Sequence, residues 1–265
     1  MATESPARTP RIRPSVPVAF GVFVVYVIVF IGLSGSSGIA YDNWFDTAPN
    51  IWRTAVLPLA AASLVLIVFL LWARWDFVFR DPERLPMGGL LTALLVVYVL
   101  MIVGQFAIAD WGGVGDKLLP ILVAGVLVGF AEETLFRGVI LRSLRTKMRP
   151  EAWVVLFSSV WFGAFHLTNI ATGLNLISGA FQMFLATAGG VFLYLFRRYR
   201  GLLVVAMAAH GLWDTSAFLP KPTGGLENVS RAFLLIEVVG AIIALIVLIR
   251  RERTITVTPE GVQQL

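Results

Sequence analysis

Three short clusters of polar side chains lie inside stretches of the chain that are otherwise apolar. Glutamate, histidine and aspartate are the residue types that transfer protons, polarise bonds or hold metals. In each cluster two residues stand four positions apart, so they share one face of a helix. The clusters hold Glu132, Glu133 and Arg137, then Phe162 and His166, then His210 and Asp214.

The two adjacent glutamates are expected to have different roles. They point about 100° apart around a helix, so we expect that they do not both face the same partner. Glu133 has Arg137 one turn away, and an ion pair would hold it ionised as a structural anchor. Glu132 has Phe136 at the corresponding place, so it is free to face a cavity. A carboxylate in a cavity of low dielectric is a competent general base.

Both histidines of the chain belong to the clusters. His166 can share with Glu132 the activation of a water molecule. His210 can donate a hydrogen bond to a developing oxyanion, with Asp214 orienting its ring. Zinc is the alternative, because Glu132, His166 and His210 form a possible ligand set.

A structural interpretation competes with the catalytic one. Glu133 and Arg137 fit a purely structural ion pair equally well, and a lone buried histidine is usually a satisfied core residue. Phe162 packs in either case, and its ring can also shape a cavity. Two histidines at the depth of a glutamate pair are harder to explain by structure alone.

The composition indicates that lipid is the main solvent of this chain. Of the 265 residues, 58% are hydrophobic and 14% charged, against roughly 25% charged in soluble domains. The net charge of +5 does not indicate nucleic acid binding, because the basic residues stand at the ends of apolar runs. Cysteine is absent, which excludes thiol catalysis, disulfides and cysteine metal sites.

A membrane-spanning helix needs about 20 mostly apolar residues, and eight segments approach this pattern. The sequence therefore predicts an all-α polytopic bundle of about eight transmembrane helices, without a second domain. The fourth segment is too long for a simple span, so it tilts or extends beyond the membrane. The segments are 16–33, 54–73, 87–109, 118–144, 152–167, 176–196, 202–218 and 232–249.

The distribution of Lys and Arg gives this bundle an orientation. With eight spans, 17 of the 21 basic residues fall on the side of both termini, and cytoplasmic loops carry such an excess. We expect a multi-pass protein of the cell membrane with both termini in the cytoplasm. Residues 1–15 and 251–265 are then cytoplasmic tails, the first disordered, and 16–250 form the membrane domain. The four basic residues on the other side are Arg53, Lys117, Lys221 and Arg231.

The helix rise of about 1.5 Å per residue tests whether the clusters can meet. Counted from the cytoplasmic ends of their spans, Glu132, His166 and Asp214 all lie roughly 20 Å deep, and His210 about 14 Å. Three helices can therefore bring these four residues to one level.

The three clusters, in this order and on separate spans, resemble the signature of the CAAX protease and bacteriocin-processing family, also called type II CAAX prenyl endopeptidase-like or Abi. The family pattern is EExxxR, FxxxH and HxxxN or HxxxD, and the resemblance covers about 118–218. It implies an intramembrane protease whose polar cavity opens within the membrane. It also implies that Glu132 and His166 activate water while His210 and Asp214 form the oxyanion site.

Asp214 stands where the prenyl-processing branch of the family has Asn. An ionised carboxylate cannot donate a hydrogen bond, so orienting His210 suits it better than binding an oxyanion. The motifs favour a glutamate-dependent mechanism with no required cofactor. The expected partners are the bilayer and a peptide or protein substrate in or near it. Two other functions stay open: a non-catalytic immunity or scaffold protein of the same fold, and a small transporter with a Glu/His proton relay.

Overall fold

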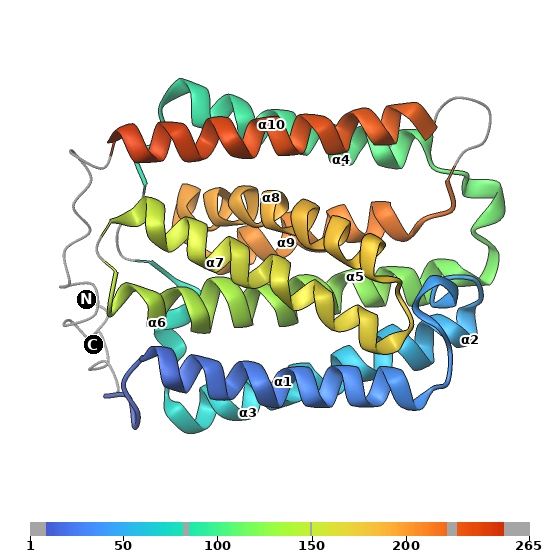
Figure 1. The fold of residues 1–265 in the computed structure, drawn as a ribbon, viewed down its shortest axis with the longest axis horizontal. Coiled ribbons are helices and arrows are strands. Elements are labelled where there is room, and N and C mark those ends of the chain that lie inside the picture. The colour runs from blue at the N-terminus through green and yellow to red at the C-terminus, as the bar shows by residue number, and fades with distance from the viewer. Residues whose placement is uncertain (1–8, 82–84, 149, 222–226, 252–265) are drawn as a thin grey trace, which may run out of the picture.

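The computed structural model describes residues 9–81, 85–148, 150–221 and 227–251, and these residues form helices and connecting turns without a strand. The helices run along the long axis of the molecule (Figure 1). The α-helices are α1 (Val16–Ser36), α2 (Ala48–Ile51), α3 (Leu57–Ala73), α4 (Gly88–Ile108), α5 (Leu118–Glu133), α6 (Leu141–Arg145), α7 (Glu151–Phe165), α8 (Leu176–Arg200), α9 (Leu203–Phe218) and α10 (Glu227–Arg251).

Short helical turns and two π-helical segments extend these α-helices. The π-helical segments are Trp52–Val56, which joins α2 to α3, and Thr134–Ile140, which joins α5 to α6. The remaining segments are 3-10 turns at Tyr41–Asn43, Asp76–Phe79, Trp111–Gly113, Gly115–Lys117 and His166–Thr172.

Seven helical stretches of the described chain are long and apolar enough to cross a membrane. Together with α9, which has 16 residues, they make the predicted set of about eight helices, so the all-α, multi-pass membrane architecture is confirmed. The helix α9 is shorter than these seven stretches and packs mainly against α5 and α8. The fourth stretch covers 31 residues, Gly115–Arg145, and exceeds a simple span as expected.

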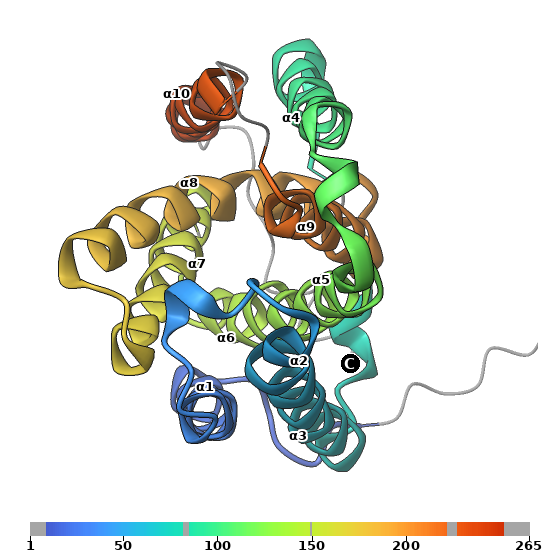
Figure 2. The ribbon, with the colours of Figure 1, turned by 90° about the vertical axis from the view of Figure 1, so that its right-hand side faces the viewer.

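The bundle is layered when it is viewed along its axis (Figure 2). The helices α1 and α3 form one side, α4 and α10 the opposite side, and α5, α7, α8 and α9 lie between them. The two largest helix interfaces join α5 to α9 and α7 to α8. The three polar clusters lie on α5 and the π-helical segment after it, on α7 and the 3-10 turn after it, and on α9.

A buried ion cluster closes the end of the bundle where α1 begins and α10 ends. The Asp81 carboxylate, 4% exposed, lies within 3.3 Å of four guanidinium groups, those of Arg142, Arg145, Arg197 and Arg198. Burial alone would raise the pKa of Asp81, but these cations hold it well below its usual range. The cluster ties the loop after α3 to α6 and α8.

The two tails lie largely outside the described residues, which begin at 9 and end at 251, so their disorder and their side of the membrane stay predictions. The described residues just before α1 contact the region after α3. The Arg11 N–H donates to the Ala73 carbonyl, and the Trp75 indole donates to the Ile12 carbonyl.

Candidate active site

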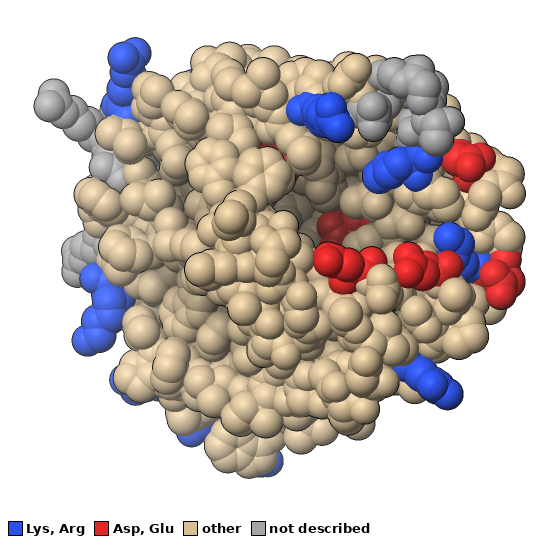
Figure 3. Space-filling model, turned by 45° about the vertical axis from the view of Figure 1, so that its right-hand side comes forward, with Lys and Arg blue, Asp and Glu red and all other residues tan. Residues whose placement is uncertain are grey.

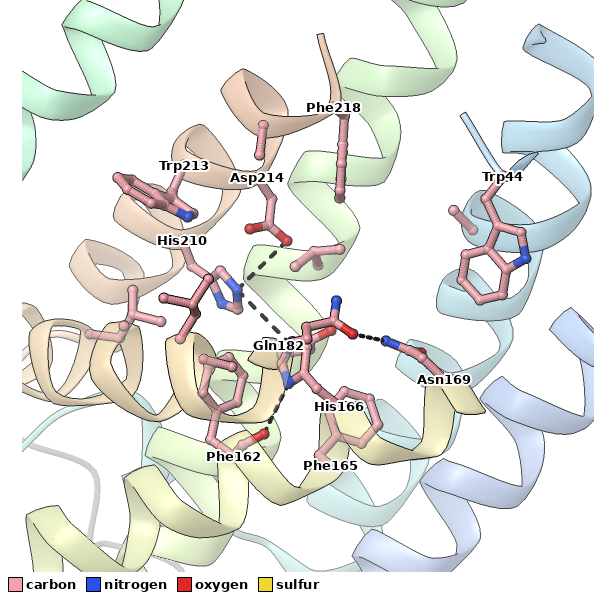
Figure 4. A pocket seen from close by; sticks show the side chains of 18 of the residues that line it. Trp44, Phe162, Phe165, His166, Asn169, Gln182, His210, Trp213, Asp214 and Phe218 are labelled. Atoms are coloured by element: carbon pink, nitrogen blue, oxygen red, sulfur yellow. Dashed lines mark hydrogen bonds and ion pairs between the residues drawn. The ribbon is translucent and has the colours of Figure 1, made fainter. Parts of the chain in front are cut away.

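A cavity of about 520 Å³ lies among the central helices. Its lining includes Glu132, His166, His210, Asp214 and Phe162, so the structure brings together all four residues with predicted catalytic roles. Figure 4 shows His210 and Asp214 on one helix facing His166 and Phe162 on another. The cavity continues to Tyr41 and Asp42 in the loop after α1, and Figure 3 shows a hollow at this end with acidic side chains at its edge and inside it.

Glycines allow α5 and α9 to approach each other closely. A Cβ atom at Gly129 would overlap the Met207 carbonyl of α9, and one at Gly211 would overlap the Gly125 carbonyl of α5. This backbone contact lies one turn from Glu132 and next to His210. It therefore sets the distance between the glutamate pair and the histidine.

His210 is held by carboxylates on both sides of its ring. Its Nδ1 lies 2.9 Å from Glu133 Oε1, while its Nε2 lies 4.0 Å from Glu132 Oε2 and 3.8 Å from Asp214 Oδ2. The expectation that the two glutamates face different partners was wrong. They sit on different faces of the helix end, but the imidazole presents a nitrogen to each of them.

Glu133 makes the closest of these contacts with His210, so it is better placed to orient the ring than Asp214, to which the sequence had suggested this role. Glu133 Oε1 also accepts from Arg137 Nη1 at 2.8 Å, which confirms the predicted pair between these residues. Arg137 is fully buried and donates a second hydrogen bond to the Gly190 carbonyl of α8. Because Glu133 binds an arginine and a histidine at once, it both anchors α5 and fixes the imidazole.

The Glu132 side chain is buried, but it is not held in place by a hydrogen bond to Oε2. It lines the cavity, and its Oε2 has no hydrogen-bond partner among the described residues. A buried polar atom without a partner is costly and usually marks a place where water or a ligand binds. The basic side chain that contacts it is His210, whose Nε2 lies 4.0 Å from Glu132 Oε2.

His166 begins the 3-10 turn that follows α7, and its Nδ1 lies 3.0 Å from the Phe162 carbonyl. A carbonyl only accepts, so Nδ1 carries the proton and Nε2 of the neutral ring is left as an acceptor. The Phe162 ring makes edge contacts with both His166 and His210, and the Arg137 guanidinium lies 4.3 Å from its centroid. Phe162 thus spaces the two imidazoles and covers the ion pair.

A chain of polar side chains crosses the mouth of the cavity. Gln182 of α8 accepts from Asn169 at 3.0 Å and donates to the Tyr41 hydroxyl at 2.7 Å. Burial raises the pKa of Tyr41 to about 12, so this hydroxyl keeps its proton at neutral pH. These hydrogen bonds connect the loop after α1 to α8 beside the site.

Several lining residues were missed by the sequence reasoning. Tyr41 and Asp42 lie in a loop, where polar residues carry no signal of their own, and Gln182 is an uncharged residue within the predicted span 176–196. Glu237 is different, because it is an ionisable residue inside the last apolar span, which is itself an indicator of function. It is 3% exposed and lines the cavity.

The structure does not support the alternative zinc site of Glu132, His166 and His210, although the hydrogen-bonded Nδ1 atoms of both histidines leave their Nε2 atoms free. Among the described residues, no group of three or more His, Asp or Glu side chains is placed so that it could hold a metal ion.

The fold and the site define a multi-pass membrane protein with a glutamate and histidine chamber in the interior of the bundle. The family model described as type II CAAX prenyl endopeptidase Rce1-like matches residues 114–216. This segment runs from the start of α5 to near the end of α9 and contains all three clusters, so the resemblance to this protease family is confirmed. No curated protein matches the chain.

Proposed function

We propose that the protein is an intramembrane endopeptidase that hydrolyses peptide bonds by means of a water activated by Glu132 and His166. The observation that supports this most is the buried Glu132 carboxylate, which has one oxygen without a partner and faces a chamber shared with both histidines.

In this proposal each step of hydrolysis has a side chain that performs it. Glu132 takes a proton from water while Nε2 of His166 accepts the second hydrogen bond that orients it. The water oxygen bonds to the carbonyl carbon, and protonated His210 donates from Nε2 to the oxyanion. The C–N bond then breaks, and the proton on Glu132 passes to the leaving amine.

The surroundings of His210 support its role as a donor. Glu133 holds Nδ1 in place and, with Glu132 and Asp214, surrounds the ring with negative charge. A protonated ring keeps an N–H on Nε2, the nitrogen between Glu132 and Asp214.

The proposal is tested with purified protein in proteoliposomes that contain a random peptide library with apolar C-terminal halves. Mass spectrometry identifies new C-termini, and ¹⁸O-water should label them. Glu132→Gln should lower the cleavage rate by about 10³-fold or more while the melting temperature stays within a few degrees. Cleavage by Glu132→Gln at the wild-type rate, or none by the wild type, would favour a scaffold or transporter.

A further inference from the structure

Glu237 brings another carboxylate into the chamber, from a helix outside the matched segment. It lies on α10, is 3% exposed and lines the same cavity as Glu132, His210 and Asp214. It makes no hydrogen bond or ion pair with any described residue. A buried carboxylate in a membrane protein is expensive unless a cation or a donor meets it.

The carboxylate of Glu237 reaches inward across α8. A Cβ atom at Gly189 of α8 would overlap Glu237 Oε1, so the absence of a side chain there leaves room for it. The charged groups within electrostatic reach of Glu237 are Asp214 and His210. Glu237 therefore extends the acidic side of the site beyond Asp214.

The acidic side chains around the chamber outnumber the basic ones that contact them. Arg137 pairs with Glu133, and His210 is shared by Glu132 and Asp214. Glu237 is left without a cation among the described residues. The chamber thus offers a carboxyl group without a described basic partner next to the proposed oxyanion donor, and Asp42 of the loop after α1 adds another to its lining. A bound cation would supply the missing partner and favour the ionised form of Glu237.

An aromatic wall stands beside these carboxylates. Tyr98 and Trp213 both line the cavity, and their rings stack with centroids 4.8 Å apart. Tyr98 interacts electrostatically with Glu237, and Trp213 directly precedes Asp214 in the sequence. Apolar walls that end in carboxylates fit a side chain with an apolar stem and a cationic head, which is the form of lysine and arginine.

We propose that Glu237 and Asp214 form a subsite that binds a lysine or arginine side chain of the substrate close to the scissile bond. This inference rests on the proposed function, because it names the substrate class of the same chamber. A metal ion is a poorer occupant, because no three His, Asp or Glu side chains of the described chain are arranged to hold one.

Binding can be tested without catalysis. The probes are phenethylammonium and its neutral counterpart 2-phenylethanol, titrated against the full-length protein in detergent and followed by melting temperature and ligand-observed NMR. The amine should bind the wild type, and Glu237→Gln should weaken the affinity for the amine by roughly tenfold or more. The alcohol should show little difference between the two proteins.

The control is Asp46→Asn, which removes an exposed carboxylate that does not line the cavity. Equal binding of amine and alcohol, or amine binding unchanged in Glu237→Gln, would overturn the subsite.

Cleavage separates failure of the subsite from failure of the proposed function. The wild type should prefer library peptides with Lys or Arg at one fixed position relative to the cut, by about tenfold over Gln. Glu237→Gln should lose this preference while it still cleaves neutral peptides. Cleavage without a basic preference would refute the subsite alone, whereas amine binding without any cleavage would refute the peptidase and leave a cation-binding chamber.

Discussion

At the scale of single residues, Glu133 shows how one side chain can serve both the fold and the site. One of its oxygens accepts from Arg137 and from His210, while Arg137 also holds α8 through the Gly190 carbonyl. The pair of Glu133 and Arg137 therefore links three central helices, α5, α8 and α9. Glu132, one residue earlier, does not link helices in this way, which leaves it available for catalysis.

Glu133→Gln is expected to destabilise the protein by about 3–5 kcal/mol, because Arg137 would stay buried without its countercharge. The measurement is thermal unfolding in detergent, with Glu132→Gln as the matched control one position away. The control should unfold near the wild-type temperature. If Glu132→Gln retains full cleavage while Glu133→Gln is well folded but inert, the roles of the two glutamates are reversed.

Sequence spacing predicted some of these contacts and missed others for a physical reason. Pairs within one helix, Glu133 with Arg137 and His210 with Asp214, follow from the helical repeat. The contact of Glu133 with His210 depends on how α5 and α9 pack, which spacing within one helix does not determine. Glu237 was visible as a charge in an apolar span, but its direction depends on how α10 packs against α8.

At the scale of elements, the end of α5 departs from a regular helix where the chemistry begins. The π-helical segment Thr134–Ile140 starts directly after Glu132 and Glu133 and contains Arg137. Such segments widen the helix locally and often occur at functional sites. Hydropathy predicted the long fourth span. No residue type identifies a π-helical segment, so this local geometry was not predictable.

Gly211→Ala is expected to push α9 away from α5, because its Cβ would overlap the Gly125 carbonyl. Overpacking of this kind costs about 1–3 kcal/mol, and a shift of about 1 Å at the site can cost 10²-fold in rate. Cleavage should therefore fall far more than stability. Gly32→Ala is the control, because its Cβ would have no neighbour within 4 Å. Equal rates for the two variants would show that this approach does not position His210.

The Asp81 cluster makes stability depend on pH. Because the pKa of Asp81 is lower in the folded protein than its ordinary value of 3.8, its contribution is complete above that value and decreases as the pH falls toward the folded-state pKa. Asp81→Asn should lower the free energy of unfolding at pH 7 by about 3–5 kcal/mol.

The measurement is the melting temperature between pH 7 and about pH 3, the range in which an unperturbed aspartate begins to protonate. The wild type should lose stability in the acid part of the range more steeply than Asp81→Asn. Asp76→Asn changes an exposed carboxylate in the same loop and should follow the wild type. Parallel curves for all three proteins would exclude Asp81 as the source of the acid sensitivity.

At the scale of the whole molecule, the excess of basic residues and the opening of the cavity lie at opposite ends of the bundle. Hydropathy predicted the number of helices, and the basic residues assigned their loops to two sides, because both signals come from the cost of charge in lipid. The cavity, by contrast, is formed by the packing of helices distant in sequence. It opens toward the loop after α1, at the end away from the Asp81 cluster, so the expected orientation places its mouth outside the cytoplasm.

The absence of cysteine allows this orientation to be tested directly. Asp46 lies in the loop after α1 and Lys147 in the loop after α6, and both side chains are exposed. A membrane-impermeant maleimide added to intact cells should label Asp46→Cys, whereas Lys147→Cys should react only after the membrane is opened, because charged reagents do not cross the lipid. Both variants should react in detergent, which controls for local reactivity. Labelling of Lys147→Cys in intact cells, with Asp46→Cys protected, would invert the topology and place the mouth of the chamber on the cytoplasmic side.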